Sequence, residues 1–278
     1  MIDLSQLSPM MQHYMETKKE YPDCVLFYRL GDFYEMFFDD ALTVSKELEI
    51  TLTGKDCGLS ERAPMCGVPF HALDSYLYRL VQKGYKVAIA EQMEDPRQAK
   101  GLVKREVIRV VTPGTITSSQ VLDETKNNYL MGIVYMDGIY GISTADISTG
   151  DFMVTEVDSD RELFDEINKF SPSEIICNNA FYMSGVDMDE LKNRYQVVIS
   201  ALDSRFFGEE SCRRILMEHF KVGALVGLGL EDYATGIIAA GAVMQYIYET
   251  QKSTLEHITT ITPYSTGQYM VCLLYTSP

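Results

Sequence analysis

The sequence predicts an α/β protein: a mixed-sheet α/β unit, then a second α/β unit, then the first helix of an all-α domain. Its 278 residues are too many for one minimal domain and suggest about two. With 46% hydrophobic and 23% charged residues, the chain can form a sizeable core and is not expected to be disordered. Patterns typical of strands alternate with helical periods in both halves, and the pattern becomes purely helical from about Tyr233.

The first elements are a helix and a strand. Ser8 followed by Pro9 is typical of an N-cap with proline at the first helical position, and it predicts a helix through about Glu20. Residues 24–30, CVLFYRL, are β-branched and aromatic, and they predict a buried strand.

The next segment, FYEMFF at 33–38, is compatible with two structures. After a Gly-Asp turn signal, Asp32-x-x-Glu35 fits a helix capping box, so a helix could begin here. The segment could equally be the return strand of a hairpin, with Asp39 capping a helix over 40–48. We favour the hairpin because aromatic residues suit strands better than a helix start, and because ALTVSKELEI supplies a helical period of its own.

This choice decides which side chains lie together. In a strand, residues two apart share a face, so Phe33, Glu35 and Phe37 would project together, whereas in a helix they would point well apart. Only the hairpin therefore places an aromatic ring beside a carboxylate. The neighbouring residues expected to pack inside are Tyr28, Tyr34, Met36 and Phe38.

The rest of the first unit contains loops, a helix and two strands. Turn-forming residues predict a loop over 53–69, and a helical period follows over about 72–83. KVAIAEQM predicts a strand at 86–93, and a further strand is expected to end at the Pro-Gly pair at 113–114. The polar segment 115–128 is interpreted as a linker.

The second unit begins at Tyr129 with three strands. YLMGIVYM, GIYGISTADIS and DFMVTEV are joined by Asp-Gly and Thr-Gly turn signals, which predict an antiparallel meander. Helix DRELFDEINKF, strands EIICN and QVVIS, and helix EESCRRILMEHF follow. Three antiparallel strands followed by alternating helices and strands favour an α/β unit of the ribonuclease H type. After it, AAGAVMQYIYETQK is interpreted as the opening of a helical domain.

The charge of the chain is acidic but uneven. Residues 1–112 carry 14 Lys and Arg against 17 Asp and Glu, a net charge of −3, whereas residues 113–278 contribute −13 of the total of −16. The segment 97–109, RQAKGLVKREVIR, has five basic residues and one acid, a local charge of +4. A polyanionic partner should therefore meet the first unit, near this segment.

The chain shows no signal for secretion, membrane insertion or metal binding. Its N-terminus lacks a basic region followed by an apolar one, and its longest apolar stretch, 236–248, is too short and too mixed to span a bilayer. The six cysteines are scattered, without a CxxC pair or a histidine at zinc-ligand spacing. We therefore expect reduced cysteines, no metal site and a cytoplasmic location.

Five long segments carry a family resemblance. They are LFYRLGDFYEMFFDDA (26–41), APMCGVPFHALDSYLYRLVQKGYKVAIAEQMEDP (63–96), KREVIRVVTPGT (104–115), ADISTGDF (145–152) and AAGAVMQYIYETQKSTLEHITTITPY (239–264). Together they resemble the N-terminal part of the MutS family of bacterial DNA mismatch-repair proteins. The resemblance implies a mismatch-recognition domain at 1–114, a linker at 115–128, a ribonuclease H-like connector at 129–232 and the start of a helical core or lever domain at 233–270.

The end of the sequence departs from the family pattern. Instead of a polar segment rich in Asp and Arg, VCLLYTSP follows STGQYM. We interpret 271–278 as an atypical tail left by truncation or assembly, and we assign no function to Cys272. No GxxxxGK[ST] motif occurs, so the ATPase of the family is absent and the chain is expected not to be an enzyme. The resemblance implies ATP, Mg²⁺ and a homodimer only for the full-length family protein.

The Phe-x-Glu motif by which the family reads mismatches falls on Phe33 and Glu35. An apolar wedge inserted at the minor groove unstacks a base step and kinks the duplex, and unstacking is easiest where pairing is already defective. The ring thus probes local deformability, while the carboxylate can accept a hydrogen bond from a displaced base. The alternative is that Phe33 belongs to the core and Glu35 is a cap or a solvated charge.

Further candidates for DNA contact lie in two segments. The first is the basic segment, whose side chains could contact phosphates or could form a solvated face. The second is MCGVPFH, expected as a loop in which glycine and proline let the backbone approach DNA, although its histidine can equally be structural. The candidates are Met65, Gly67, Pro69, His71, Arg97, Lys100, Lys104, Arg105 and Arg109.

Two other functions compete with DNA mismatch binding. A metal-dependent nuclease could use carboxylates to bind Mg²⁺, but YLMGIVYM lacks the carboxylate that ribonuclease H-type nucleases carry in their first strand. A protein-interaction scaffold is also possible, because the acidic connector suits docking of a protein partner, and the resemblance suggests MutL. The carboxylates considered for the nuclease are Asp32, Glu35, Asp39 and Asp40.

Overall fold

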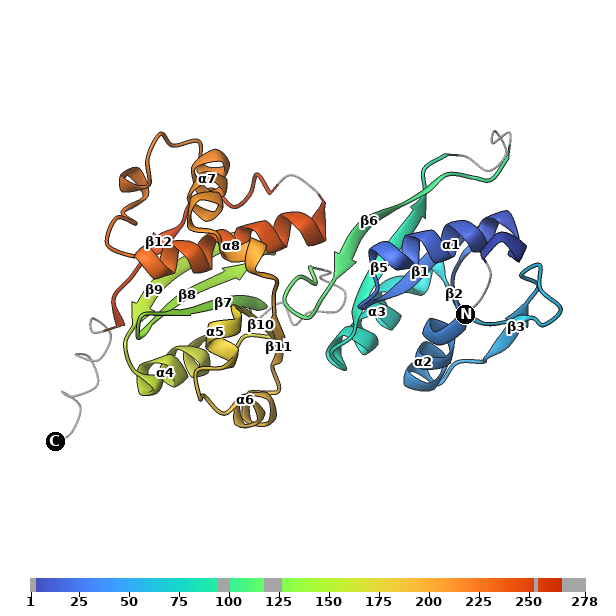
Figure 1. The fold of residues 1–278 in the computed structure, drawn as a ribbon, viewed down its shortest axis with the longest axis horizontal. Helices are drawn as coiled ribbons and strands as arrows, with labels where there is room; N and C mark the ends of the chain where they lie inside the picture. The colour runs from blue at the N-terminus through green and yellow to red at the C-terminus, as the bar shows by residue number, and fades with distance from the viewer. Residues whose placement is uncertain (1–3, 95–100, 118–126, 253–254, 267–278) are drawn as a thin grey trace. The chain divides into compact units, whose positions relative to one another are not determined.

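The computed structural model describes residues 4–94, 101–117, 127–252 and 255–266. The chain divides into two compact units, Met1–Val121 with Thr250–Lys252, and Leu122–Glu249 with Ser253–Pro278. Figure 1 shows the helices and strands of each unit. Among the described helices, none has the length and apolar character that crossing a membrane requires.

The first unit is a six-stranded mixed sheet in the order β3-β4-β2-β1-β5-β6. β1 and β5 are parallel, and the other neighbouring strands are antiparallel. The strands are β1 (Cys24–Leu30), β2 (Phe33–Phe37), β3 (Thr53–Lys55), β4 (Ala63–Pro69), β5 (Lys86–Gln92) and β6 (Arg105–Val111). The helices are α1 (Pro9–Glu20), α2 (Phe38–Leu48) and α3 (Leu73–Gln82), with short 3-10 helices η1 (Leu4–Gln6) and η2 (Phe70–Ala72).

The hairpin interpretation of 33–38 is confirmed. β2 runs antiparallel to β1, with Tyr28 opposite Glu35 and Leu30 opposite Phe33. Gly31 makes the turn with a φ of +59°, which glycine adopts without a steric penalty because it has no Cβ.

α2 begins earlier than expected, and Asp39 does not cap it. Phe37 occupies the cap position without a side-chain hydrogen bond, while Asp39 lies exposed in the first helical turn. The chain passes directly from β2 into α2, so no polar residue lies between the two elements. Asp39 and Asp40 still favour the helix, because negative charge near a helix N-terminus interacts well with its dipole.

The segment expected as a loop over 53–69 instead contains the strands β3 and β4. β4 pairs with β2 on one side and with β3 on the other, and Gly54 lies opposite Pro64. Glycine and proline weaken the local strand signal, but two neighbouring strands supply the backbone hydrogen bonds regardless of that signal. Long-range pairing therefore overrides local propensity here.

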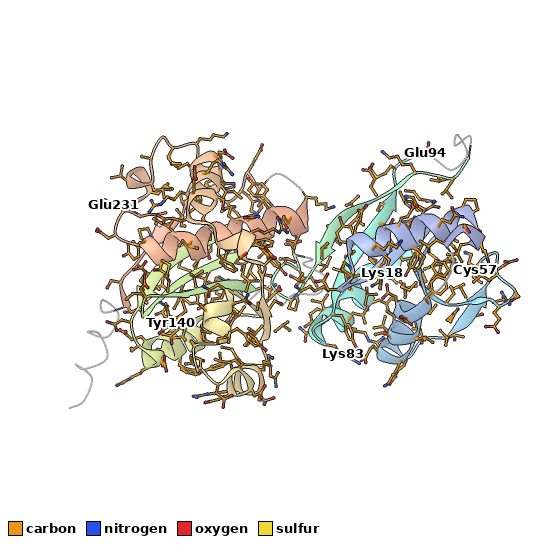
Figure 2. All side chains as sticks on the ribbon, in the orientation of Figure 1. Lys18, Cys57, Lys83, Glu94, Tyr140 and Glu231 are labelled. Carbon is orange, nitrogen blue, oxygen red and sulfur yellow. The ribbon has the colours of Figure 1, made fainter. Side chains whose placement is uncertain are left out.

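The two faces of the first sheet are covered by different helices. On one face, Tyr14 of α1 packs against Tyr28 and against Phe37, whose ring centroid lies 4.9 Å away at 87°. On the other face, Cys66 of β4 contacts the carbonyl of Ala41 in α2. The side chains that fill both layers are drawn in Figure 2.

The prediction of which side chains are buried is confirmed except at two neighbouring residues, Phe37 and Phe38. Tyr28, Tyr34 and Met36 are buried, but Phe38 is only partly buried, and Phe37 is buried in its place. Phe37 shares a face with Phe33 and Glu35, as expected, yet α1 covers that face at Phe37. The exposed part of this face is therefore confined to its other end.

The segment expected as a linker at 115–128 begins as part of the first unit. Thr115 and Ile116 are buried, and the Thr115 hydroxyl accepts the backbone N–H of Thr112 at 2.9 Å. Residues 118–126 lie outside the described part of the chain.

The second unit is also a six-stranded mixed sheet, in the order β11-β10-β7-β8-β9-β12. The expected meander of β7, β8 and β9 is present, and β10 and β11 are added parallel to β7. This order and these directions agree with the expected ribonuclease H type. The strands are β7 (Tyr129–Met136), β8 (Ile139–Asp146), β9 (Asp151–Val157), β10 (Glu174–Cys177), β11 (Val198–Ala201) and β12 (Thr262–Pro263).

Helices cover both faces of the second sheet (Figure 1). One core includes Leu163 of α4, Phe181 of α5 and Leu191 of α6. The other includes Leu216 of α7 and Val243 of α8. These helices are α4 (Asp160–Phe170), α5 (Asn179–Tyr182), α6 (Met188–Tyr195), α7 (Glu209–Phe220) and α8 (Ala234–Gln251), with η3 (Ser204–Phe207) and η4 (Leu225–Leu228).

α8 differs from the expectation that residues 233–270 open a separate helical domain. Its apolar residues pack in one core with Leu130 and Val154 of the second sheet, and β12 adds to the edge of that sheet. Glycines on the sheet allow the approach: a Cβ on Gly141 would lie 2.4 Å from the Thr235 carbonyl group, and one on Gly132 would lie 2.5 Å from Val243. The helical pattern of the sequence does not reveal which surface the helix covers.

Candidate nucleic-acid interface

The β1–β2 hairpin places Phe33 and Glu35 on one face, at the end of the first sheet. Phe33 is the first residue after the turn and lies opposite Pro69 of β4, while Glu35 lies opposite Gly67. Phe33 keeps 46% of its surface exposed, unusually much for a phenylalanine in a central strand. The arrangement of an exposed ring beside a carboxylate, expected from the sequence, is therefore present.

A polar network on the opposite face supports the hairpin from behind. The Tyr34 hydroxyl donates to the Glu91 carboxylate of β5, and the Arg29 guanidinium lies 3.5 Å from the same carboxylate. Burial and this hydrogen bond raise the pKa of Tyr34 far above its ordinary value, so the hydroxyl remains a donor. Arg29 also lies over the ring of Phe70, 4.1 Å from its centroid.

Glu35 is not a free carboxylate. The Lys55 ammonium group of β3 donates to Oε2 of Glu35 at 2.5 Å. The side chains of Glu35 and Lys55 are 15% and 33% exposed, so the ion pair is partly shielded from water. Lys55 was not among the residues predicted from the sequence, because the strands that bring it to Glu35 were expected to be a loop.

The segment from Met65 to His71 is not the loop that the sequence predicted. Met65, Gly67 and Pro69 belong to β4, whose backbone is held in the sheet. His71 lies exposed in η2, beside the Phe70 ring. Phe70, which sequence analysis also missed, is 42% exposed, and its backbone N–H donates to the Asp32 carbonyl at 2.9 Å.

The basic segment is placed only in part. Arg97 and Lys100 lie outside the described residues. Lys104 is exposed and pairs with Glu106 at 2.5 Å, and this carboxylate raises the pKa of Lys104. Arg109 is partly exposed, with its guanidinium 3.9 Å from Asp74.

Arg105 differs from the other described residues of the basic segment. Its side chain is buried, and its guanidinium donates to the carbonyl groups of Arg29 at 2.7 Å and Val103 at 2.6 Å. It also lies over the Tyr28 ring, 5.1 Å from the centroid. Arg105 thus connects β6 to the end of β1, and its charge is not presented to a ligand.

The four carboxylates considered for a nuclease do not converge. Asp40 is buried and accepts hydrogen bonds from Leu26, Tyr14 and Lys18, while Glu35 is paired with Lys55. Within the described ranges, no group of three or more His, Cys, Asp or Glu side chains is arranged to hold a metal ion.

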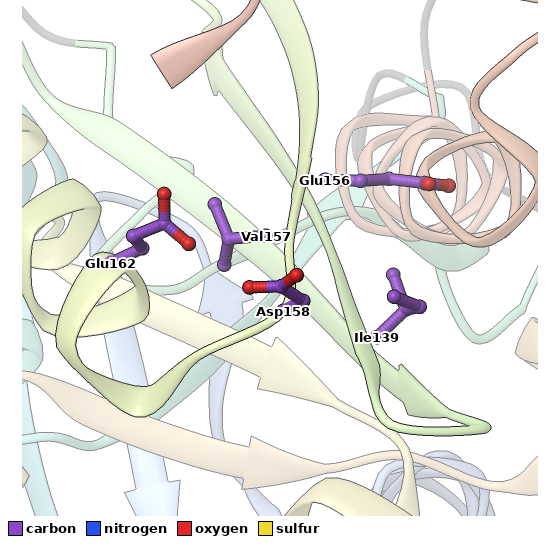
Figure 3. Close-up of a pocket in the computed structure, with 5 residues that line it drawn as sticks. All are labelled: Ile139, Glu156, Val157, Asp158 and Glu162. Carbon is purple, nitrogen blue, oxygen red and sulfur yellow. The ribbon is translucent and has the colours of Figure 1, made fainter. Parts of the chain in front are cut away.

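The second unit has an acidic pocket of about 250 Å³. Figure 3 shows its lining residues, Ile139, Glu156, Val157, Asp158 and Glu162. Glu156 accepts the backbone N–H groups of Thr235 and Gly236 at 2.7 and 2.9 Å, so it caps the start of α8. Glu162 is engaged by the Ser159 hydroxyl at the start of α4. Two of the three carboxylates therefore have structural roles.

Comparison with known proteins matches both units to domains of one protein family. Residues 8–120 match the family model described as MutS domain I, and residues 128–259 match MutS domain II. The second match includes α8, in agreement with its packing on the second sheet.

Curated relatives are similar over almost the whole chain. The chain is 61% identical over 268 residues to the DNA mismatch repair protein MutS of Lachnoclostridium phytofermentans, covering 96% of this chain and 29% of that protein. It is 52% identical over 271 residues to MutS of Acetivibrio thermocellus, with 96% and 31% covered, and 47% identical over 267 residues to MutS of Clostridium tetani, with 95% and 29% covered. The chain thus spans about 30% of the length of these relatives.

Proposed function

Because this chain belongs to the MutS family, as its matches to MutS domains I and II establish, we propose that its first unit recognises mismatched double-stranded DNA. The observation that carries the proposal is the exposed Phe33 ring beside Glu35 on the β1–β2 hairpin. A wedge must resist the stacked bases that it separates. The network of Tyr34, Arg29 and Glu91 behind the hairpin supplies that resistance.

In this proposal, Phe33 inserts at a base step from the minor groove, and the duplex kinks there. Unstacking costs a few kcal/mol, and less where a base is mispaired or unpaired. Glu35 accepts a hydrogen bond from the displaced base, and exposed basic side chains such as Lys104 contact phosphates without reading sequence. Discrimination then arises from the deformability of the duplex rather than from its sequence.

We further propose that the chain is the N-terminal part of a longer protein, whose clamp and ATPase lie outside it. ATP and Mg²⁺ belong to that longer protein. The described residues offer no metal-binding cluster, so no step in this chain is assigned to either. The longer protein is proposed to act as a homodimer, with the second unit docking a MutL-type partner. The chain itself is proposed to have no enzymatic activity, and a plasmid-nicking assay with Mg²⁺ or Mn²⁺ should detect none.

The main test compares two labelled duplexes that differ only in one base pair or one unpaired base. Fluorescence anisotropy with the full-length protein should give a lower Kd for the defective duplex. We define the mismatch preference as the ratio of Kd for the matched duplex to Kd for the mismatched duplex. A mismatch preference of one would overturn the proposed function.

A further inference from the structure

Building on the proposed function, we propose that Lys55 is a positioning residue for the Glu35 carboxylate and so helps to determine mismatch preference. Lys55 acts through Glu35 and need not touch the base itself. The two side chains form an ion pair, with 2.5 Å between Nζ and Oε2.

The sheet brings these two residues together across an intervening strand. Lys55 is the last residue of β3, Glu35 lies in β2, and β4 runs between them. The β4 residue opposite Glu35 is Gly67, where a Cβ would lie 3.2 Å from the Tyr34 carbonyl oxygen and 3.5 Å from Cγ of Glu35. A side chain at position 67 would crowd the Glu35 side chain, so glycine there leaves room for it.

The pairing leaves Glu35 with one oxygen engaged and one available. Lys55 binds Oε2, and within the described residues Oε1 accepts no hydrogen bond. A carboxylate can accept hydrogen bonds through both oxygens, so Oε1 can serve a displaced base while Oε2 stays on Lys55. The Lys55 ammonium group also lies 5.7 Å from the centroid of the Phe37 ring, which is itself buried under α1. The Lys55 end of the ion pair thus lies near a buried ring.

Two physical effects follow from this arrangement. A glutamate held in one orientation loses less side-chain entropy when it binds a base, which strengthens the contact made only with the mismatched duplex. In addition, Lys55 offsets the negative charge of Glu35, which otherwise would repel the phosphates of any duplex. The first effect changes the mismatch preference, and the second changes affinity for both duplexes alike.

The test measures mismatch preference in the full-length protein. Lys55→Met should weaken binding to both duplexes and lower the mismatch preference by about threefold to tenfold, the range expected for losing a charge-assisted, partly exposed contact. Lys55→Arg keeps a charged donor and should restore the preference to within about twofold. Lys55→Gln is measured in parallel, with thermal unfolding of each variant, so that a folding defect in one variant does not decide the result.

A double-mutant cycle shows whether Lys55 acts through Glu35. In a Glu35→Gln background, Lys55→Met should leave the mismatch preference unchanged. Lys83→Met is the matched control, because Lys83 pairs with Glu47 at 2.8 Å away from the hairpin and should change neither Kd.

The outcomes separate this inference from the proposed function. An unsubstituted protein without mismatch preference would overturn both. If the unsubstituted protein shows a mismatch preference, and Lys55→Met and Lys55→Gln leave it unchanged, only the role of Lys55 is overturned. If Lys55→Met lowers the mismatch preference equally with Glu35 present and in the Glu35→Gln background, the role of Lys55 is also overturned, because Lys55 would then act on DNA directly.

Discussion

The carboxylate of Asp40, in the first turn of α2, accepts a hydrogen bond from the backbone N–H of Leu26 in β1 at 2.9 Å. β2 pairs with β1 only from Tyr28 to Leu30, because the chain leaves the sheet at Phe37 to form α2. The Asp40 side chain therefore takes the place of a strand partner for Leu26.

Asp40→Ala should destabilise the protein by about 2–4 kcal/mol, because it leaves a buried N–H unsatisfied and removes the carboxylate that pairs with Lys18. Urea unfolding followed by circular dichroism measures this change. Asp39→Ala is the control: Asp39 is exposed, and its loss should change the free energy of unfolding by no more than about 0.5 kcal/mol. Equal effects of the two substitutions would contradict the role assigned to Asp40.

Phe33→Ala should abolish the mismatch preference of the full-length protein, since base–aromatic stacking contributes about 1–3 kcal/mol. Anisotropy titrations with matched and mismatched duplexes measure this. Leu42→Ala is the control, because Leu42 of α2 is as exposed as Phe33, 47% against 46%, and should leave both Kd values unchanged. A Phe33→Ala protein that still prefers the mismatch would mean that the ring is not the wedge.

Lys104 and Arg105 are adjacent but should behave differently. Lys104→Ala should weaken binding to both duplexes alike and lower the slope of log K against log salt by about one, if this exposed ammonium group contacts a phosphate. Arg105→Ala should mainly lower the melting temperature, because the buried guanidinium holds two backbone carbonyl groups. Salt titrations and thermal melts of both variants decide this. If Lys104→Ala lowers the affinity for mismatched DNA alone, this residue senses the lesion.

Stability should fall as the pH rises above about 8.5, the ordinary pKa of a cysteine thiol. Burial raises the pKa of Cys24, Cys66, Cys177 and Cys212 to about 12 in the folded protein. The unfolded chain therefore releases thiol protons first. Because the folded state then binds more protons than the unfolded state, the free energy of unfolding decreases with pH.

Urea midpoints measured between pH 7.5 and 9.5 test this dependence, below the range in which tyrosine and lysine ordinarily titrate. Cys66→Ala should make the fall less steep, since it removes one of the four thiols. A midpoint that stays constant across this range would show that the buried thiols do not contribute.

Residues 1–278 alone should bind DNA weakly, with a Kd of about 10⁻⁴–10⁻⁶ M at physiological salt. The first unit offers a single small module, its local positive charge is modest, and Arg105 is not available to DNA. The chain as a whole carries a net charge of −16. Anisotropy titration of the isolated chain measures this affinity. Nanomolar, mismatch-selective binding would show that the hairpin needs no further domain to hold a kinked duplex.

The sequence by itself determined the features that depend on neighbouring residues. The aromatic residues of β2 and the Gly-Asp turn signal favour the hairpin, and the two-residue period of a strand then places Phe33 and Glu35 on one face. The meander of the second unit follows in the same way from its turn signals and short apolar strands. In these elements, each strand pairs with its neighbour in the sequence across a short turn.

Only the tertiary structure decided which charges are available and which surfaces are covered. Lys55 pairs with Glu35, which lies 20 residues earlier in the sequence. Arg105 is buried and donates to a carbonyl group 76 residues earlier. Phe37 and Phe33 share a face, but α1 lies over one and not over the other. Such outcomes depend on strand order and on helix packing between distant segments, which local propensity and periodicity do not encode.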